Sequence, residues 1–373
     1  GVLNGSPPRD IKAGGRVGML FGYPLAATQN NWLHDCVLDA VTTVHSLVDA
    51  KKRYPAWPKI LPDAHQAALK SRTGLRDRLK AYDTALRKLA SKRERDVIFV
   101  AITDQNRIAD LLSNSCDCAA LDKLPPAIHA AVTSLFDYVF GLLTDLKVRD
   151  EHYKAIYDAA TDHVCPFCGT EYFDAPGAPR EALDHYLAKS RYPFAAANLR
   201  NLVPMGHKCN SNYKLAVDVL YDVDGGRRVA FDPYNHTSIY LVLDDSEPFD
   251  GSTPSTPRWT IKFEPDGPAI PTWDAVFSIR ERYQRDHLDE GYSAWLREFQ
   301  NWARSADRDG DTDASLLEAL RKFEQFHAGN GMSSKAFLKA AVFRMLRLRC
   351  EQGHDRLKQL LRDLLRPLAA PTT

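Results

Sequence analysis

The chain has 373 residues, 44% hydrophobic and 26% charged, which is the composition of a soluble globular protein long enough for two or three domains. A formal net charge of +1 excludes a global field that attracts nucleic acid, so any affinity for phosphate depends on local patches. No apolar run approaches the roughly 18 residues that a membrane span needs, and seven cysteines in so long a chain favour a reducing cytoplasm over a disulfide framework.

The first part of the chain predicts helices. Residues 1–30 are rich in Gly and Pro and predict a loose arm or extended lead-in. Apolar residues then recur at helical spacing over residues 32–48, and again over residues 128–146 after two prolines. The run VIFVAI at residues 97–102 fits either a buried strand or the core of a helix. We therefore expect residues 1–162 to form a helical amino-terminal domain.

A basic stretch lies within this domain. Residues 70–95 contain ten Lys and Arg and three Asp and Glu, which leaves a local charge of +7. A solvated helix face and a rail for a phosphate backbone explain this pattern equally well.

Residues 165–214 contain the motifs that carry chemistry. Cys165 and Cys168 form a CxxC knuckle of the kind that binds zinc, whereas the CxC of Cys116 and Cys118 fits a polar turn better.

Asp184 and His185 are adjacent in a short apolar run, so a strand would direct them to opposite faces. Two amides follow, one before a second apolar run and one at the start of a predicted helix, at Asn201 and Asn210. An acid, an imidazole and two amides can hold a hard cation beside a general base, which suits phosphodiester cleavage.

These residues resemble the HNH endonucleases, the zinc-knuckle branch of the ββα-metal nucleases. The elements CPxCG, LDHYLxKSxYP, NLVP and CNxxxK recur in that order, and the flanks RDEHYKAIYDAATDHV and AFDPY are also similar to bacterial members. The resemblance implies that His185 is the general base and that Asp184 and Asn210 bind Mg²⁺ or Mn²⁺. It implies that Asn201 ties the loop between the strands and so orients His185. Lys214 would contact the same phosphate, or be a solvated helix lysine.

Three departures from the family pattern are visible. Ala188 stands where a proline is common, so the loop after the first strand is expected to be looser. Lys214 follows Asn210 by four residues where three is commoner, which moves it around the helix. The second knuckle has Gly206 in place of its first cysteine, so Cys165, Cys168 and Cys209 supply only three thiolates. We expect a structural zinc whose fourth ligand is His207, with His163 as the alternative.

The remainder predicts a small β region and then helices. Strands are expected over residues 217–221, 228–231, 238–243 and 259–263, with a turn at Asp224-Gly225-Gly226 and a surface loop over residues 246–257. The carboxy-terminal region has aromatic and leucine stripes at helical spacing, and its last stripe, over residues 357–365, needs a partner in this chain or another. A second basic candidate surface consists of Lys335, Lys339, Arg344, Arg347 and Arg349.

Together these observations predict an α+β fold with mainly helical regions around a central ββα-metal module and a small β-sheet insert. The expected divisions are residues 1–162, the module at 163–216, the β region at 217–265 and the helical region at 266–373. The expected function is a cytoplasmic, metal-dependent endonuclease acting on nucleic acid, DNA favoured over RNA, without a membrane. A protein partner or homo-oligomer through the terminal helices fits this view, and resemblance alone implies a role in restriction or phage defence. The alternative is an inactive zinc-knuckle binding or scaffold protein.

Overall fold

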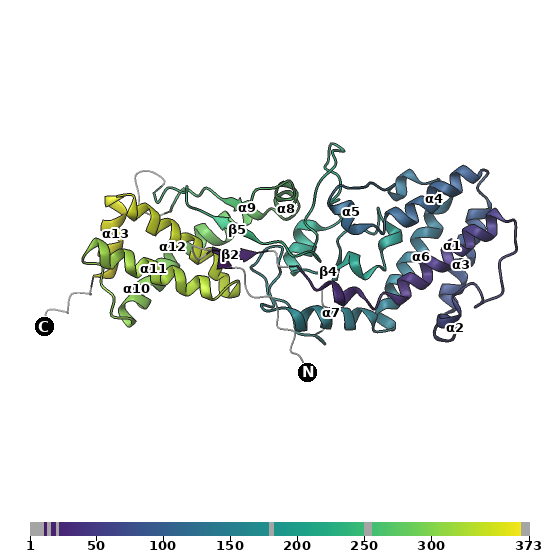
Figure 1. Ribbon diagram of the computed structural model, residues 1–373, viewed down its shortest axis with the longest axis horizontal. Helices are drawn as coiled ribbons and strands as arrows, with labels where there is room; N and C mark the ends of the chain where they lie inside the picture. Colours follow the sequence, from purple (N-terminus) through teal and green to yellow (C-terminus); the bar gives the residue numbers. More distant parts are fainter. Residues whose placement is uncertain (1–10, 13–15, 20–21, 179–182, 250–255, 367–373) are drawn as a thin grey trace. The chain divides into compact units, whose positions relative to one another are not determined.

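The computed structural model describes residues 11–12, 16–19, 22–178, 183–249 and 256–366 (Figure 1). The protein is a mainly helical α+β protein, with 58% helix and small sheets, as the sequence predicts. It divides by compactness into two units, each discontinuous in sequence. The helical unit consists of residues 22–163 and 173–236, and the sheet unit consists of residues 1–21, 164–172 and 237–373.

The helical unit begins with a series of helices. They are α1 (Trp32–Asp49), α2 (Asp63–Leu69), α3 (Thr73–Arg87), α4 (Lys92–Asp104), α5 (Ile108–Leu112), α6 (Pro126–Asp145) and α7 (Val148–Ala159). The predicted helices over residues 32–48 and 128–146 are confirmed by α1 and α6. The VIFVAI run lies inside α4, whose first turn is closed by a capping box between Ser91 and Glu94. The basic stretch is therefore two helices, α3 and α4, separated at the cap.

The core of this unit forms where α1, α3 and α6 pack together. Gly74 of α3 lies against the ring of Tyr138, where an added Cβ would come within 2.6 Å of a ring carbon. Contrary to the sequence expectation, α6 is long and apolar enough to cross a membrane by length and composition. Its apolar side chains, including Phe136 and Val139, are buried in the core of the unit, as in the core helix of a globular protein.

A two-stranded antiparallel sheet carries the HNH-like motif. Strand β3 (Leu183–His185) pairs with β4 (Leu202–Pro204), so that His185 lies opposite Leu202. Residues 186–201 connect them through two 3₁₀ turns, Pro193–Ala195 and Leu199–Asn201. The apolar side chains of this loop enter the same core as the helices, and Phe194 packs edge-to-face on Phe136 of α6 with ring centroids 5.3 Å apart. The hairpin is thus anchored to the helical core.

The sheet unit contains a four-stranded antiparallel sheet in the order β1-β2-β5-β6. Its strands are β1 (Ile11–Lys12), β2 (Arg16–Met19), β5 (Ile239–Val242) and β6 (Lys262–Glu264). The expectation of a loose arm over residues 1–30 is therefore wrong for β1 and β2. The strand predicted over residues 238–243 is confirmed by β5, whereas the strand predicted over residues 259–263 begins only at Lys262, as β6. Residues 250–255 of the predicted loop lie outside the described residues.

The other two predicted strands, over residues 217–221 and 228–231, do not form. Only a single bridge joins Tyr221 to Arg227 around the predicted turn, where the Asp222 carboxylate accepts the N–H groups of Asp224 and Gly226. Beyond the turn, Ala230 donates its N–H to the carbonyl of Leu112 at the end of α5. Because the Ala230 N–H is satisfied by this helix end, residues 228–231 do not continue a strand ladder with residues 217–221.

The carboxy-terminal part of the sheet unit is helical, as predicted. Its helices are α8 (Ala269–Phe277), α9 (Ile279–Arg282), a π-helical segment (Tyr283–Asp289), α10 (Glu290–Ser305), α11 (Asp313–Gly329), α12 (Ala336–Glu351) and α13 (Asp355–Leu365). The aromatic residues form a core, in which the rings of Phe299, Phe323 and Phe343 meet in tilted and edge-to-face contacts with centroids 4.5 to 5.2 Å apart. The leucine stripe of α13 is buried against α10, α11 and α12, so its partner lies in this chain.

Candidate functional site

His185 lies at the end of β3, with its ring against Phe140 of α6 at a centroid separation of 4.4 Å. Its Nε2 lies 2.9 Å from the carbonyl oxygen of Ala196. Because a carbonyl only accepts hydrogen bonds, Nε2 carries the proton and donates it. Nδ1 of the neutral ring therefore holds a free lone pair, which is the atom that a general base needs.

Burial is the main cause that lowers the pKa of His185 to about 4; the hydrogen bond to Ala196 opposes this shift, and the nearby cations Lys189, Lys214 and Arg149 add to it. At neutral pH the imidazole is therefore uncharged and able to accept a proton. The surrounding core thus keeps the ring in the form that a general base requires.

Asp184 precedes His185, and its carboxylate pairs with Lys214. The Lys214 Nζ forms an ion pair with Asp184 Oδ2 at 2.8 Å and donates a hydrogen bond of 2.8 Å to the carbonyl oxygen of His185. Burial raises the pKa of the Asp184 carboxyl group, and the Lys214 ammonium opposes this shift. The Lys214 side chain is fully buried, so the alternative of a solvated helix lysine is wrong. A contact between Lys214 and phosphate stays a prediction.

The predicted helix that carries Asn210 and Lys214 is a single π-helical turn, Cys209–Lys214. Its closing bond runs from the N–H of Leu215 to the carbonyl oxygen of Asn210 over 3.0 Å, five residues apart. Such a turn is wider than an α-helical one, so it accommodates the extra residue between Asn210 and Lys214. The Asn210 amide is partly exposed and forms no hydrogen bond with any described residue, which leaves its oxygen available.

Asn201 fixes the loop between the strands. Its side chain is fully buried; Oδ1 accepts the N–H of Leu187 at 2.7 Å, and Nδ2 donates to the carbonyls of Leu187 at 3.0 Å and Ala195 at 3.3 Å. Ala195 is adjacent to Ala196, the residue that holds His185. The loop is also closed at Ala188, whose carbonyl accepts two backbone N–H groups, so the expected looseness there is not observed.

Sequence reasoning missed the residues that cover the outer edge of β4. Tyr234 donates its hydroxyl proton to the carbonyl of Leu202, and Tyr23 donates to the carbonyl of Pro204. His152 of α7 lies 2.9 Å from the Tyr234 hydroxyl and 3.0 Å from the Leu202 carbonyl. Two of these residues belong to the RDEHY and AFDPY flanks, so similarity in the flanks was the available signal. They satisfy the strand edge that β3 leaves unpaired.

The structure brings the thiols of Cys165, Cys168 and Cys209 within 4.8 Å of one another, and all three residues are buried. Tetrahedral coordination at about 2.3 Å places zinc-bound sulfurs roughly 3.8 Å apart, so this buried cluster can hold a metal such as zinc. Gly169 follows the knuckle with a φ of +69°, a conformation that glycine adopts without strain. Thr170 Oγ1 donates to Cys168 Sγ over 3.3 Å, the type of bond that orients a thiolate ligand.

Neither predicted fourth ligand belongs to this cluster. His207 is exposed, and the ring of His163 stacks on Tyr157 at a centroid separation of 3.7 Å while its Nε2 lies 3.1 Å from the Tyr157 carbonyl. Among the described residues, the cluster contains three thiols and no fourth ligand atom.

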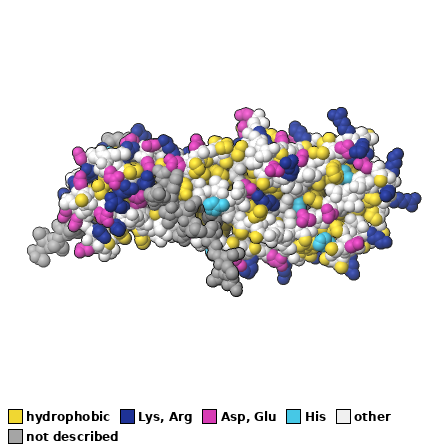
Figure 2. All heavy atoms as spheres, in the orientation of Figure 1, with side chains coloured by type: hydrophobic (Ala, Val, Ile, Leu, Met, Phe, Trp, Pro, Cys, Tyr) yellow, Lys and Arg dark blue, Asp and Glu magenta, His cyan; other side chains and the backbone are white. Residues whose placement is uncertain are grey.

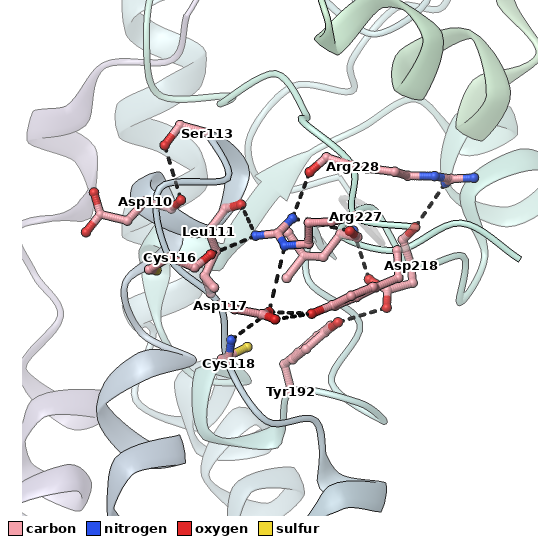
Figure 3. Close-up of polar contacts among 12 residues, drawn as sticks. Asp110, Leu111, Ser113, Cys116, Asp117, Cys118, Tyr192, Asp218, Arg227 and Arg228 are labelled. Carbon is pink, nitrogen blue, oxygen red and sulfur yellow. Dashed lines mark hydrogen bonds and ion pairs between the residues drawn. The ribbon is translucent and has the colours of Figure 1, made fainter. Parts of the chain in front are cut away.

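A separate polar network surrounds Cys116 and Cys118 (Figure 3). The Arg227 guanidinium donates to the carbonyls of Leu111 and Cys116, and Asp117 accepts the hydroxyl of Tyr221. Burial raises the pKa of the Cys118 thiol to about 12, which keeps it protonated. This network fixes a turn to the segment after Lys214, in agreement with the prediction of a polar turn rather than a metal pair.

Most of the cations on the two basic candidate surfaces form ion pairs. In α3 and α4, Asp83 pairs with Lys80 and Arg87, and Asp49 pairs with Arg95. In α12, the acids opposite Arg344, Arg347 and Arg349 are Asp244, Glu324 and Glu247. Figure 2 shows basic and acidic side chains interspersed over the face that it draws. A continuous row of unpaired cations along either surface is therefore not supported, and nucleic-acid binding stays a prediction.

No protein-family model matches the chain, and searches of curated proteins and of solved structures found no match. The function is therefore inferred from the chemistry of the site residues.

Proposed function

We propose that the protein is a metal-dependent endonuclease of the HNH type that hydrolyses phosphodiester bonds, with DNA favoured over RNA. The observation that carries the proposal is the hydrogen bond from His185 Nε2 to Ala196, because it fixes the tautomer whose Nδ1 can accept a proton. Asp184 on the same strand and Asn210 on the π-helical turn supply oxygen atoms of the kind that a hard cation prefers.

His185 is the general base in this proposal. Its Nδ1 takes a proton from the water that attacks phosphorus, and the fixed Nε2–H bond stabilises the resulting imidazolium against the Ala196 carbonyl. The core residue Phe140 and the loop held by Asn201 keep the ring in one orientation. Since the loop is anchored in the core, this orientation exists before substrate binds.

The donor set of Asp184 and Asn210 fits Mg²⁺ or Mn²⁺, which bind oxygen ligands and retain several waters. When bound, such an ion supplies positive charge that stabilises the phosphate and the leaving oxygen. Asp184 Oδ2 pairs with Lys214, and Oδ1 is the remaining carboxylate oxygen. The three thiols fit a structural zinc, which would contribute to folding rather than to the reaction.

The pair between Asp184 and Lys214 also supports the alternative function, an inactive binding or scaffold protein. The Lys214 ammonium neutralises the carboxylate in the absence of an added cation, so the site is stable without a catalytic metal. Cleavage activity separates these two functions directly.

The test is cleavage of supercoiled, linear and single-stranded DNA and of RNA by the purified protein. We expect cleavage with added Mg²⁺ or Mn²⁺ and none with EDTA, and restoration when metal is returned. Absence of cleavage of every substrate with either metal, by folded protein that contains zinc, would favour the scaffold function. Cleavage that persists in EDTA would exclude the assignment of Asp184 and Asn210 as metal ligands.

A further inference from the structure

A cavity of about 280 Å³ lies within the sheet unit, between the cysteine knuckle and the residues that precede α12. Its lining comes from three segments and consists of Val164, Gly169, Thr170, Tyr172, Trp295, Met332, Ser334, Lys335 and Lys339. This cavity contains none of the residues proposed to act in phosphodiester cleavage.

The walls of the cavity are held in close contact. Gly169 has a φ of +69°, and a Cβ added there would lie 2.3 Å from the terminal methyl group of Met332 and 3.1 Å from the ring of Phe337, so the two walls approach closely at this residue. The backbone N–H of Ser334 donates to the Tyr172 hydroxyl over 2.7 Å. The knuckle and the segment before α12 are therefore fixed to each other, and the cavity is a built feature of the unit.

The cavity is cationic. Two lysines line it and no Asp or Glu does. Lys339 pairs with Glu298 at 2.7 Å, whereas Lys335 forms no ion pair with any described residue. The Lys335 ammonium therefore faces the cavity without a neutralising carboxylate. Its positive charge repels cations, which excludes a metal cation as the ligand and favours an anion.

The hydrogen-bond donors match an anion with several oxygens. The Tyr172 hydroxyl accepts the Ser334 N–H, so its own proton is free to donate. The Ser334 hydroxyl and the Lys335 ammonium are further donors in the same lining. A tetrahedral phosphate accepts bonds from several directions at once, and ammonium groups bind it well as point charges.

We propose that this cavity binds the phosphate group of a phosphate ester. The apolar lining formed by Val164, Trp295 and Met332 leaves room beside the phosphate for the esterified group. A free nucleotide and the terminal phosphate of a nucleic-acid strand share this chemistry. The proposal stands on the lining of the cavity and is independent of the nuclease proposal.

The test is isothermal titration calorimetry on the full chain carrying His185→Ala, without added Mg²⁺ and at low salt. The probes are inorganic phosphate, adenosine monophosphate, and one short oligonucleotide with and without a 5′-phosphate. Lys335→Asn keeps a residue that tolerates the φ of +60° at this position while removing the charge. Tyr172→Phe removes the hydroxyl of an exposed ring together with its hydrogen bond from the Ser334 N–H, and Lys322→Gln on α11, outside the cavity, is the matched control.

We expect Lys335→Asn and Tyr172→Phe each to weaken binding of phosphate-bearing probes about tenfold or more, because each loses a hydrogen bond to a charged group, and Lys322→Gln to leave it unchanged. Binding of adenosine monophosphate identifies a free nucleotide as the source of the ligand. Binding of the 5′-phosphorylated oligonucleotide alone identifies a strand end. Equal binding of both oligonucleotides without binding of adenosine monophosphate, no binding of any probe, or unchanged affinity in both folded variants overturns the proposal.

Discussion

The Lys214 ammonium lies 2.8 Å from Asp184 Oδ2 and 2.8 Å from the carbonyl oxygen of His185. One buried cation therefore contacts two consecutive residues of the strand that carries the proposed base. Burial and the π-helical turn combine to produce this contact, because the wide turn directs Lys214 inward.

Lys214→Met should destabilise the protein, because it leaves the Asp184 carboxylate largely buried without its cation. The expected loss of unfolding free energy is about 3 kcal/mol, as for other broken buried pairs. Asp184→Asn combined with Lys214→Met should recover part of that loss, since the unpaired charge is gone. Urea unfolding of the two variants measures both effects. Wild-type stability in Lys214→Met would show that the pair is energetically unimportant.

His185→Ala should abolish cleavage while leaving nucleic-acid binding nearly intact, because a general base acts in the transition state. His129→Ala is the matched control, since His129 also places Nε2 2.9 Å from a backbone carbonyl, that of Leu124. Cleavage rates of both variants under saturating substrate provide the measurement. A His185→Ala variant that cuts at the wild-type rate would rule out His185 as the base.

Asn201→Ala should mainly lower the stability of the protein, whereas Asn210→Ala should mainly change its metal requirement. Asn201→Ala leaves the buried Leu187 N–H and the carbonyls it held unsatisfied, so we expect a loss of roughly 1–3 kcal/mol and reduced cleavage. Asn210→Ala removes an amide without a hydrogen-bond partner among the described residues, so stability should hold while the Mg²⁺ concentration needed for cleavage rises. Thermal unfolding and metal titrations distinguish them. Equal stability losses in both would contradict the positioning role of Asn201.

Cys165→Ser, Cys168→Ser and Cys209→Ser should each lower zinc content and stability, since a structural zinc contributes folding free energy. Elemental analysis should find about one zinc per wild-type chain. Cys36→Ser, at a buried cysteine of α1, is the control and should retain zinc. His207→Ala and His163→Ala should also retain it, because both histidines lie outside the thiol cluster. Fully stable protein without bound metal would show that zinc does not contribute to folding.

Stability should fall as the pH drops from about 6.5 to about 4. Burial lowers the pKa of His34 and of His45 to about 4, whereas an unfolded chain titrates near 6.5. Between these values the unfolded state binds protons that the folded state does not, so protonation favours unfolding, by at most about 3 kcal/mol per histidine. Urea unfolding at pH 7.5 and pH 5 measures the slope. Replacing both histidines by Gln should reduce the slope, with the remainder due to His185, His287 and His327, whose pKa burial also lowers to about 4, whereas His207→Gln, at an exposed position, should leave it unchanged.

The sequence by itself determined the main helices and the residue types of the motif. Regular apolar spacing predicts α1, α6 and the carboxy-terminal helices, because a helix buries one face and its period is fixed by backbone geometry. The resemblance of residues 165–214 to the HNH pattern predicted a hairpin with a thiol knuckle, and β3, β4 and the cluster of Cys165, Cys168 and Cys209 agree with it.

Only the tertiary structure decided which atoms of those residues are available. The partner of His185 Nε2 is Ala196, eleven residues along the chain, and the partner of Asp184 is Lys214, thirty residues along. The strand edge is covered by Tyr23 and Tyr234, which come from opposite ends of the helical unit. Such contacts depend on how segments distant in sequence pack together. The periodicity of apolar residues carries information only about residues that are close in the sequence. The same reason applies to the cationic cavity, whose lining is assembled from the knuckle, α10, the segment before α12 and the first turn of α12.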